Sequence, residues 1–117
     1  MLPLFYRARV GALSIPFANP RHAHEYKVLK RYPLPDGMLL LPGVIDSTTN
    51  YVEHPEVVAD RIEQAVDAVG DRTRVIASTD CGFGTFAGSE NVAPSVVWAK
   101  LRALGEGAAL ATRRLFT

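Results

Sequence analysis

The sequence has a single cysteine, Cys81, among its 117 residues. It can therefore form no internal disulfide and no zinc site made only of its own cysteines, and a lone thiol is typical of a reducing compartment. No uncharged apolar run reaches the roughly 18 residues that a membrane-spanning helix needs. Arg7 and Arg9 stand inside the N-terminal apolar run, whereas a secretory signal carries its positive charges before that run. We therefore expect a cytoplasmic protein.

An excess of charge of either sign is also missing. Thirteen Lys and Arg residues stand against 12 Asp and Glu residues, which gives a formal net charge of +1. This balance provides no electrostatic reason to bind nucleic acid or an anionic membrane surface. The length is that of one ordinary domain. The charge balance therefore predicts neither nucleic acid nor a membrane as a partner.

Three strand–helix pairs follow one another along residues 11–117, and residues 1–10 remain an unplaced N-terminal segment. The predicted strands are residues 11–17, 38–45 and 74–78, and the predicted helices are residues 22–31, 54–69 and a last helix that begins at Pro94 or Ser95. Such alternation predicts a parallel sheet with right-handed crossovers. Three strands leave two uncovered edges, so we expect a homo-oligomer or a part of a longer chain.

The two long helices carry signals for their ends and faces. Pro55 suits the first helical position, Gly70 is a usual stop, and His54 is better explained as a cap than as a ligand. In the last helix, helical spacing predicts one inward apolar face. Its members are Val97, Trp98, Leu101, Leu104, Ala108 and Leu115.

Ligands of open or closed parallel sheets bind beyond the carboxyl ends of the strands, and Cys81 and Asp46 are expected there. A thiolate directly after a buried strand is a soft ligand for zinc or a nucleophile, although the same position also suits a buried, unreactive cysteine. Asp46 ends the strand of residues 38–45. It could accept a hydrogen bond from a substrate amine, or it could organise its own loop as an Asx-type turn.

Two weaker motifs have simpler explanations. Gly82 to Ala87 fits the dinucleotide pattern G-x-G-x-x-A. A helix should start within such a motif, but the next predicted helix begins only at Pro94 or Ser95. His22 and His24 would share a face only in an extended chain. After Asn19-Pro20 the chain is expected to turn, which favours a solvated loop over a metal site.

Three segments together resemble one enzyme family. They are IPFANPRHAHEY (residues 15–26), LPGVIDSTTN (residues 41–50) and VIASTDCGFG (residues 75–84). They resemble the C-terminal end of the cobalamin-independent methionine synthase family, and most closely its short relatives that contain the catalytic domain alone. The resemblance runs from about Gly11 to Phe116, and Asp80-Cys81-Gly82 is its most specific element.

The resemblance implies a fold and an activity. The family fold is a (β/α)8 TIM barrel, so the predicted fold class is α/β, with residues 11–117 forming the last three βα units and their parallel strands. In the family, zinc holds homocysteine as a thiolate that attacks the N5-methyl group of a folate. The resemblance makes Cys81 a zinc ligand and Asp46 a residue that lines the substrate pocket. The expected function is methyl transfer in methionine biosynthesis, with a small thiol and a methyl donor as partners.

The chain departs from the family at four ligand or relay positions. The histidine and cysteine zinc ligands would lie upstream of residue 1, the glutamate ligand would fall near Pro16, and Thr48 stands where the family has a proton-relay histidine. Zinc is therefore expected only if donors outside this chain complete the site. One alternative is a non-catalytic, truncated barrel that oligomerises without metal. Another is a decarboxylase-like relative that binds a tetrapyrrole, which would need a basic pocket that the sequence does not indicate.

Overall fold

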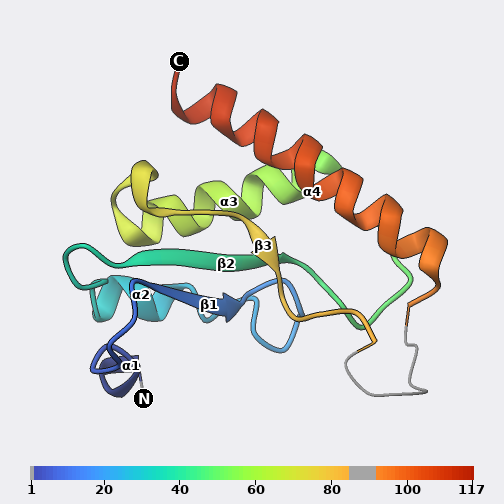
Figure 1. The fold of residues 1–117 in the computed structure, drawn as a ribbon. Helices are drawn as coiled ribbons and strands as arrows, with labels where there is room; N and C mark the ends of the chain where they lie inside the picture. Colours follow the sequence, from blue (N-terminus) through green and yellow to red (C-terminus); the bar gives the residue numbers. More distant parts are fainter. Residues whose placement is uncertain (1, 85–91) are drawn as a thin grey trace.

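The computed structural model describes residues 2–84 and 92–117 (Figure 1). The described chain is a mixed α/β structure whose parallel strands alternate with helices. Its elements, in chain order, are α1 (Leu2–Phe5), β1 (Ala12–Pro16), α2 (Lys27–Arg31), β2 (Leu39–Ile45), α3 (Pro55–Val69), the 3-10 turn η1 (Arg72–Arg74), β3 (Ser78–Thr79) and α4 (Pro94–Leu115).

The sheet has the strand order β1-β2-β3, and both strand pairs are parallel. β1 pairs with β2 in an unbroken register from Ala12↔Leu39 to Pro16↔Gly43. β3 pairs with the end of β2 through Gly43↔Ser78 and Ile45↔Thr79, with an irregularity between the two pairs. The central position of β2 explains its continuous apolar sequence, because a strand covered on both faces has no polar side. The predicted parallel sheet is confirmed.

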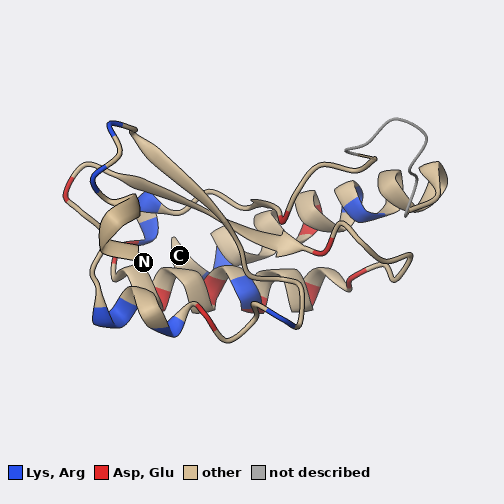
Figure 2. Cartoon of the chain, turned by 90° about the horizontal axis from the view of Figure 1, so that it is seen from below, with Lys and Arg blue, Asp and Glu red and all other residues tan. Residues whose placement is uncertain are grey.

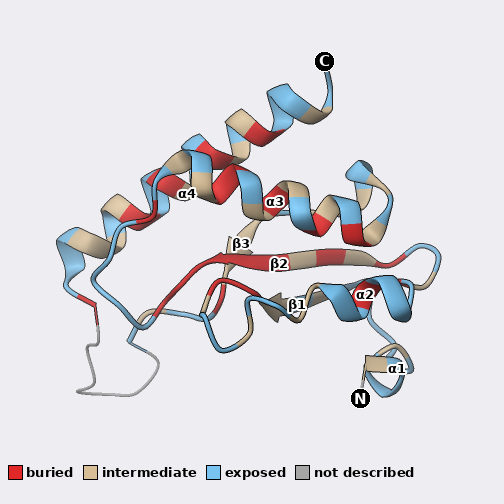
Figure 3. Ribbon diagram, turned by 180° about the vertical axis from the view of Figure 1, so that it is seen from behind, coloured by how far each residue is buried: buried red, intermediate tan, exposed pale blue. Residues whose placement is uncertain are grey.

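Two helices pack in layers over the sheet: α3 lies on β2, and α4 crosses α3 (Figure 1). Their buried positions face each other and the sheet (Figure 3). Exposed ion pairs also join the helices, because Lys30 of α2 lies 2.7 Å from Asp67 and Arg114 of α4 lies 3.1 Å from both Asp60 and Glu63. Basic and acidic positions are interspersed along these helices (Figure 2).

α3 begins and ends where the sequence predicts. The ring Nδ1 of His54 accepts a hydrogen bond from the backbone N–H of Glu56 at 3.1 Å, which confirms the predicted cap. Pro55 opens the helix. Gly70 ends it at a φ of 83°, in the left-handed region that glycine adopts without strain.

The predicted strand over residues 74–78 is wrong in its position. Residues 72–74 form the turn η1, Val75 makes only an isolated bridge with Leu40, and β3 is Ser78–Thr79. The cause is local: the side chain of Asp71 accepts hydrogen bonds from the backbone N–H of Thr73 at 2.9 Å and from its hydroxyl at 2.6 Å. Such side-chain bonds compete with strand pairing.

The predicted helix over residues 22–31 is correct only for Lys27–Arg31. The preceding residues form turns instead. Asn19 accepts a hydrogen bond from the backbone N–H of Arg21 at 3.0 Å through its side chain, and from that of His22 at 2.8 Å through its carbonyl. These bonds hold the chain in a turn after Pro20 and delay the start of the helix.

The predicted inward face of the last helix is partly wrong. Trp98 is 72% exposed and Leu101 is 37% exposed, whereas Leu104, Ala108 and Leu115 pack against the core as expected. The fully buried positions are Lys100, Ala103, Gly107 and Ala111. Small residues form most of this face because α3 and α4 approach each other closely, which leaves the larger side chains at its borders.

Residues 2–10 begin with the short helix α1, and the hydroxyl of Tyr6 donates a hydrogen bond to the carbonyl of Tyr32 at 2.6 Å. Within the described ranges, the structure contains no helix that is both long and apolar enough to cross a membrane.

Candidate functional site

A cleft of about 410 Å³ lies at the carboxyl ends of the three strands. The loops that follow β1, β2 and β3 all contribute to it, as expected for parallel strands whose ends meet at one edge of the sheet. Both residues predicted from the sequence, Asp46 and Cys81, line this cleft. The full lining consists of Pro16, Asn19, Arg21, His22, Asp46, Ser47, Thr48, Asp80 and Cys81.

Asp80 joins the loop after β3 to the loop after β1. One of its carboxylate oxygens accepts hydrogen bonds from the backbone N–H groups of Phe17 at 3.1 Å and Ala18 at 2.9 Å, and the other accepts from Asn19 at 2.7 Å. Its own N–H donates to the carbonyl of Ile45 at 2.8 Å. Asp80 is buried, and bonds to an ionised acceptor are the stronger kind. The sequence analysis gave Asp80 no role, although it directly precedes Cys81.

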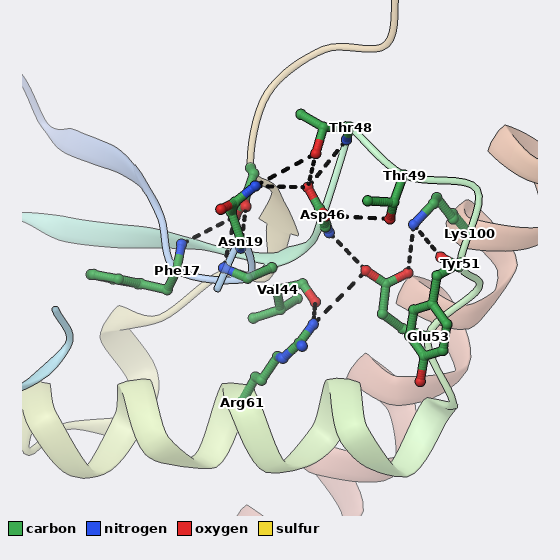
Figure 4. Close-up of polar contacts among 12 residues, drawn as sticks. Phe17, Asn19, Val44, Asp46, Thr48, Thr49, Tyr51, Glu53, Arg61 and Lys100 are labelled. Atoms are coloured by element: carbon green, nitrogen blue, oxygen red, sulfur yellow. Dashed lines mark hydrogen bonds and ion pairs between the residues drawn. The ribbon is translucent and has the colours of Figure 1, made fainter. Parts of the chain in front are cut away.

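Asp46 directly follows β2 and is a buried residue of the cleft lining. One oxygen accepts from the backbone N–H of Thr48 at 3.1 Å and from its hydroxyl at 2.9 Å, and the other accepts from the hydroxyl of Thr49 at 3.2 Å. The Asn19 amide lies 3.5 Å away (Figure 4). The Asx-type turn considered for Asp46 is therefore present, and contact with a substrate remains a prediction.

These contacts determine the charge state of Asp46. Burial raises the pKa of its carboxyl group, but the hydrogen bonds from Thr48, Thr49 and Asn19 together outweigh burial and hold the pKa below the ordinary value of 3.8. Asp46 is consequently a carboxylate at neutral pH. It contributes a negative charge to the cleft lining, which suits a cationic or hydrogen-bond-donating group.

A buried ion pair lies behind Asp46. Glu53 accepts a hydrogen bond from the backbone N–H of Asp46 at 2.7 Å through one oxygen, and its other oxygen lies 2.8 Å from the ammonium group of Lys100 (Figure 4). Arg61 lies 3.8 Å from Glu53 and donates to the carbonyl of Val44 at 3.0 Å. Sequence reasoning missed this cluster. The sequence signal for this cluster is Lys100, which shares one face of its helix with the small residues Ala103, Gly107 and Ala111.

Cys81 is exposed, which excludes the buried, unreactive position that the sequence left open. The hydroxyl of Thr79 donates to its backbone carbonyl at 2.9 Å. The dinucleotide-like segment from Gly82 to Ala87 runs into residues 85–87, which lie outside the described residues, as do residues 89–91 of the predicted loop before Pro94.

His22 contributes a second potential ligand to the cleft lining, but it pairs with Glu25 at 2.9 Å, and His24 is exposed without lining the cleft. Across residues 2–84 and 92–117, no three His, Cys, Asp or Glu side chains come together in a group that could hold a metal ion. Cys81 alone therefore does not make a complete zinc site in this part of the chain.

Comparisons with known proteins place this geometry beside two enzymes. No protein-family profile matches the chain. Over 86 residues it is 34% identical to the 2-hydroxypropyl-CoM lyase of Xanthobacter autotrophicus, an alignment that covers 71% of this chain and 22% of that protein. The chain thus spans about a fifth of the length of this curated relative.

The structural comparison covers almost the whole chain. It matches the B12-independent methionine synthase from Shewanella sp. W3-18-1, solved in complex with selenomethionine, with a TM-score of 0.78 and 25% identity over 98% of this chain and 30% of that one. B12 is cobalamin, so this neighbour has the activity of the family that the three sequence motifs resemble. The described chain is therefore a parallel α/β structure that matches a fragment of a methionine synthase.

Proposed function

We propose that the chain is the C-terminal part of a zinc-dependent thiol methyltransferase or alkyltransferase related to cobalamin-independent methionine synthase. Residues 11–117 would form the last three βα units of a TIM barrel, and residues 1–10 would lie outside those units. The strand order and the 98% coverage in the structural match support this placement. We also propose a cytoplasmic location, where a free thiol stays reduced.

One observation carries the proposal: the exposed thiol of Cys81 and the buried carboxylate of Asp46 line the same cleft at the carboxyl ends of the strands. Catalytic groups of TIM barrels occupy this end of the strands. The names of the two similar enzymes contain methionine and 2-hydroxypropyl-CoM, and both of these compounds are thioethers with a carbon–sulfur bond. A site that makes or breaks a carbon–sulfur bond fits both comparisons.

The reaction that we propose is methyl transfer from a folate to homocysteine. The sulfur of the thiolate forms a bond to the methyl carbon, the bond between that carbon and the folate N5 breaks, and N5 keeps the electron pair and takes up a proton. Asp46 would accept a hydrogen bond from the substrate amine, since its carboxylate is ionised at neutral pH. The two substrates and an adjoining part of the enzyme are then the partners of this chain.

The described residues do not fit a complete zinc site. They offer Cys81 as a sulfur donor, and they contain no group of three suitable donors. The resemblance would place the family's glutamate ligand near Pro16, whose side chain cannot bind a metal. We therefore assign Cys81 as one zinc ligand on condition that a longer chain or a partner subunit supplies the others.

The alternative is a truncated barrel without metal or turnover, which self-associates through its uncovered strand edges. It needs no donors from elsewhere, and the described residues contain no group of three suitable donors. It predicts no zinc under any condition, whereas the first proposal predicts zinc once the missing donors are present. Metal content therefore separates the two functions.

The test uses the protein expressed from the complete reading frame that contains this chain. Wild type, Cys81→Ser and the exposed control Gln64→Ala are analysed for zinc, mass by sedimentation, and methionine formation from homocysteine and a 5-methylfolate. We expect about one zinc per site in wild type and in Gln64→Ala, and loss of zinc and activity in Cys81→Ser. Equal zinc in all three proteins would remove Cys81 from the metal site. Absence of zinc and activity in wild type would establish the alternative.

A further inference from the structure

The ion pair between Glu53 and Lys100 is almost completely shielded from solvent. The side chain of Lys100 is 0% exposed and that of Glu53 is 1% exposed, and their charged atoms lie 2.8 Å apart. Desolvating two charges is costly, and apolar residues of similar volume often replace such a pair without loss of stability. A buried pair of this kind therefore calls for a role in addition to packing.

The pair connects three separate elements to the cleft. Lys100 comes from α4, Glu53 precedes α3, and Asp46 directly follows β2 (Figure 4). The ammonium group of Lys100 also donates to the carbonyl of Tyr51, in the same loop as Glu53. One oxygen of Glu53 thus pairs with Lys100, and the other accepts the N–H of Asp46 at 2.7 Å and lies 3.8 Å from Arg61.

The backbone and the side chain of Asp46 face opposite sides. Its backbone N–H points toward Glu53, while its carboxylate points to the opposite side, toward Thr48 and Asn19 (Figure 4). An ionised acceptor binds an N–H more strongly than a neutral one and specifies its direction. The charge on Glu53 therefore holds the backbone that orients the Asp46 carboxylate.

We propose that Glu53, oriented by Lys100, is a positioning residue that holds the Asp46 carboxylate at the cleft for substrate binding. The substrate contact rests on the proposed function. The position of Asp46 does not, so it can be measured without an assay of activity.

The decisive experiment separates positioning from stability. The double variant Glu53→Leu/Lys100→Met removes both charges and keeps an apolar core, while Glu53→Gln/Lys100→Met also removes both charges but places an amide at position 53, whose oxygen can accept the Asp46 N–H. Arg61 stays partly exposed and can be solvated in both variants. Hydrogen exchange of the Asp46 N–H is measured by NMR, with the N–H of Ile62, on the buried face of α3, as the reference.

In the Leu/Met variant we expect the Asp46 N–H to exchange about tenfold faster or more relative to Ile62, and in the Gln/Met variant we expect most of that protection to return. Equal acceleration at Asp46 and Ile62 would reduce the pair to a purely structural role, and unchanged protection at Asp46 would overturn the proposal. If the Leu/Met variant does not fold, the Gln/Met variant decides. Its Asp46 amide proton should shift upfield from wild type, because the neutral acceptor is weaker, and an unchanged shift would overturn the proposal.

The hydrogen-exchange result can be interpreted even if the proposed function is wrong. If the protein from the complete reading frame forms no methionine but Asp46 loses protection as expected, the positioning inference stands and the assigned reaction is wrong. If methionine forms but protection at Asp46 is unchanged, the reaction stands and the positioning inference is wrong.

Discussion

The carboxylate of Asp80 occupies the space in which a side chain at Gly43 would begin. A Cβ atom added to Gly43 would lie 2.1 Å from Oδ1 of Asp80 and 2.7 Å from its Cα. Glycine in the centre of β2 thus allows the loop after β3 to approach the sheet closely. The same approach lets Asp80 reach the backbone N–H groups of Phe17, Ala18 and Asn19.

Gly43→Ala is expected to destabilise the protein by about 2–4 kcal/mol, because overpacking adds to the loss of hydrogen bonds by Asp80. The added Cβ would meet backbone atoms of Asp80 as well as its side chain, so a side-chain rotation cannot relieve the clash. Chemical denaturation of wild type and variant measures the effect. Gly11→Ala is the matched control, since its Cβ would meet no described atom within 4 Å. A Gly43→Ala protein as stable as the Gly11→Ala protein would contradict the assigned contact.

Asp80→Asn is expected to lower the free energy of unfolding by about 1–3 kcal/mol. The substitution exchanges a carboxylate that accepts three N–H groups for an amide whose nitrogen would face some of those donors. Asp67→Asn is the control: this exposed aspartate pairs only with Lys30 among the described ion pairs, and its loss should cost no more than about 0.5 kcal/mol. Thermal unfolding of the two variants checks the difference. Similar melting temperatures would show that the three N–H bonds contribute little.

The parts of the fold that the sequence predicts well are those in which local and global signals agree. The apolar run of residues 38–45 becomes β2 because the centre of a parallel sheet is covered on both faces, and α3 has its cap at His54 and its stop at Gly70. The short β3 escaped prediction because bonds between Asp71 and Thr73 favour a turn where β-branched residues indicated a strand. Local side-chain hydrogen bonds of this kind are not visible in hydrophobic patterns.

The sequence predicts the residues of the candidate site that follow strand ends. It does not predict the ion pair between residues that are far apart in the sequence. Asp46 and Cys81 reach one cleft because both follow parallel strands. Lys100 lies in a helix, where a charged residue is normally assigned to solvent, and its partner Glu53 stands 47 positions away. Only the crossing of α4 over α3 brings them together, and helical periodicity of a single segment does not contain that information.

Gly107→Ala is expected to destabilise the crossing of α4 over α3 by about 1–3 kcal/mol. Its Cβ would lie 2.4 Å from Cβ and Cγ1 of Val58 and 2.9 Å from the carbonyl oxygen of Pro55. Gly105→Ala, two positions away in the same helix, meets no described atom within 4 Å and should stabilise by about 0.5–1 kcal/mol, since alanine loses less conformational freedom. Denaturant midpoints of the two variants should therefore move in opposite directions, and a shift of both in the same direction would contradict the close packing.

Asp46→Asn is expected to make stability less sensitive to acid. The pKa of the Asp46 carboxyl in the folded protein lies below the ordinary value of 3.8. The folded state therefore favours the ionised form, and this contribution to stability is fully present above 3.8 and is lost as the pH falls through the lower folded-state pKa. Asparagine does not titrate, so the variant lacks this loss.

Asp71 also has a lowered pKa, chiefly because of hydrogen bonds from Thr73, and the stability that it loses in acid is the same in wild type and variant. Unfolding free energies measured from neutral pH down to below 3.8 should converge for wild type and variant as acid is added, and parallel curves would show that the loop around Asp46 does not stabilise its charge.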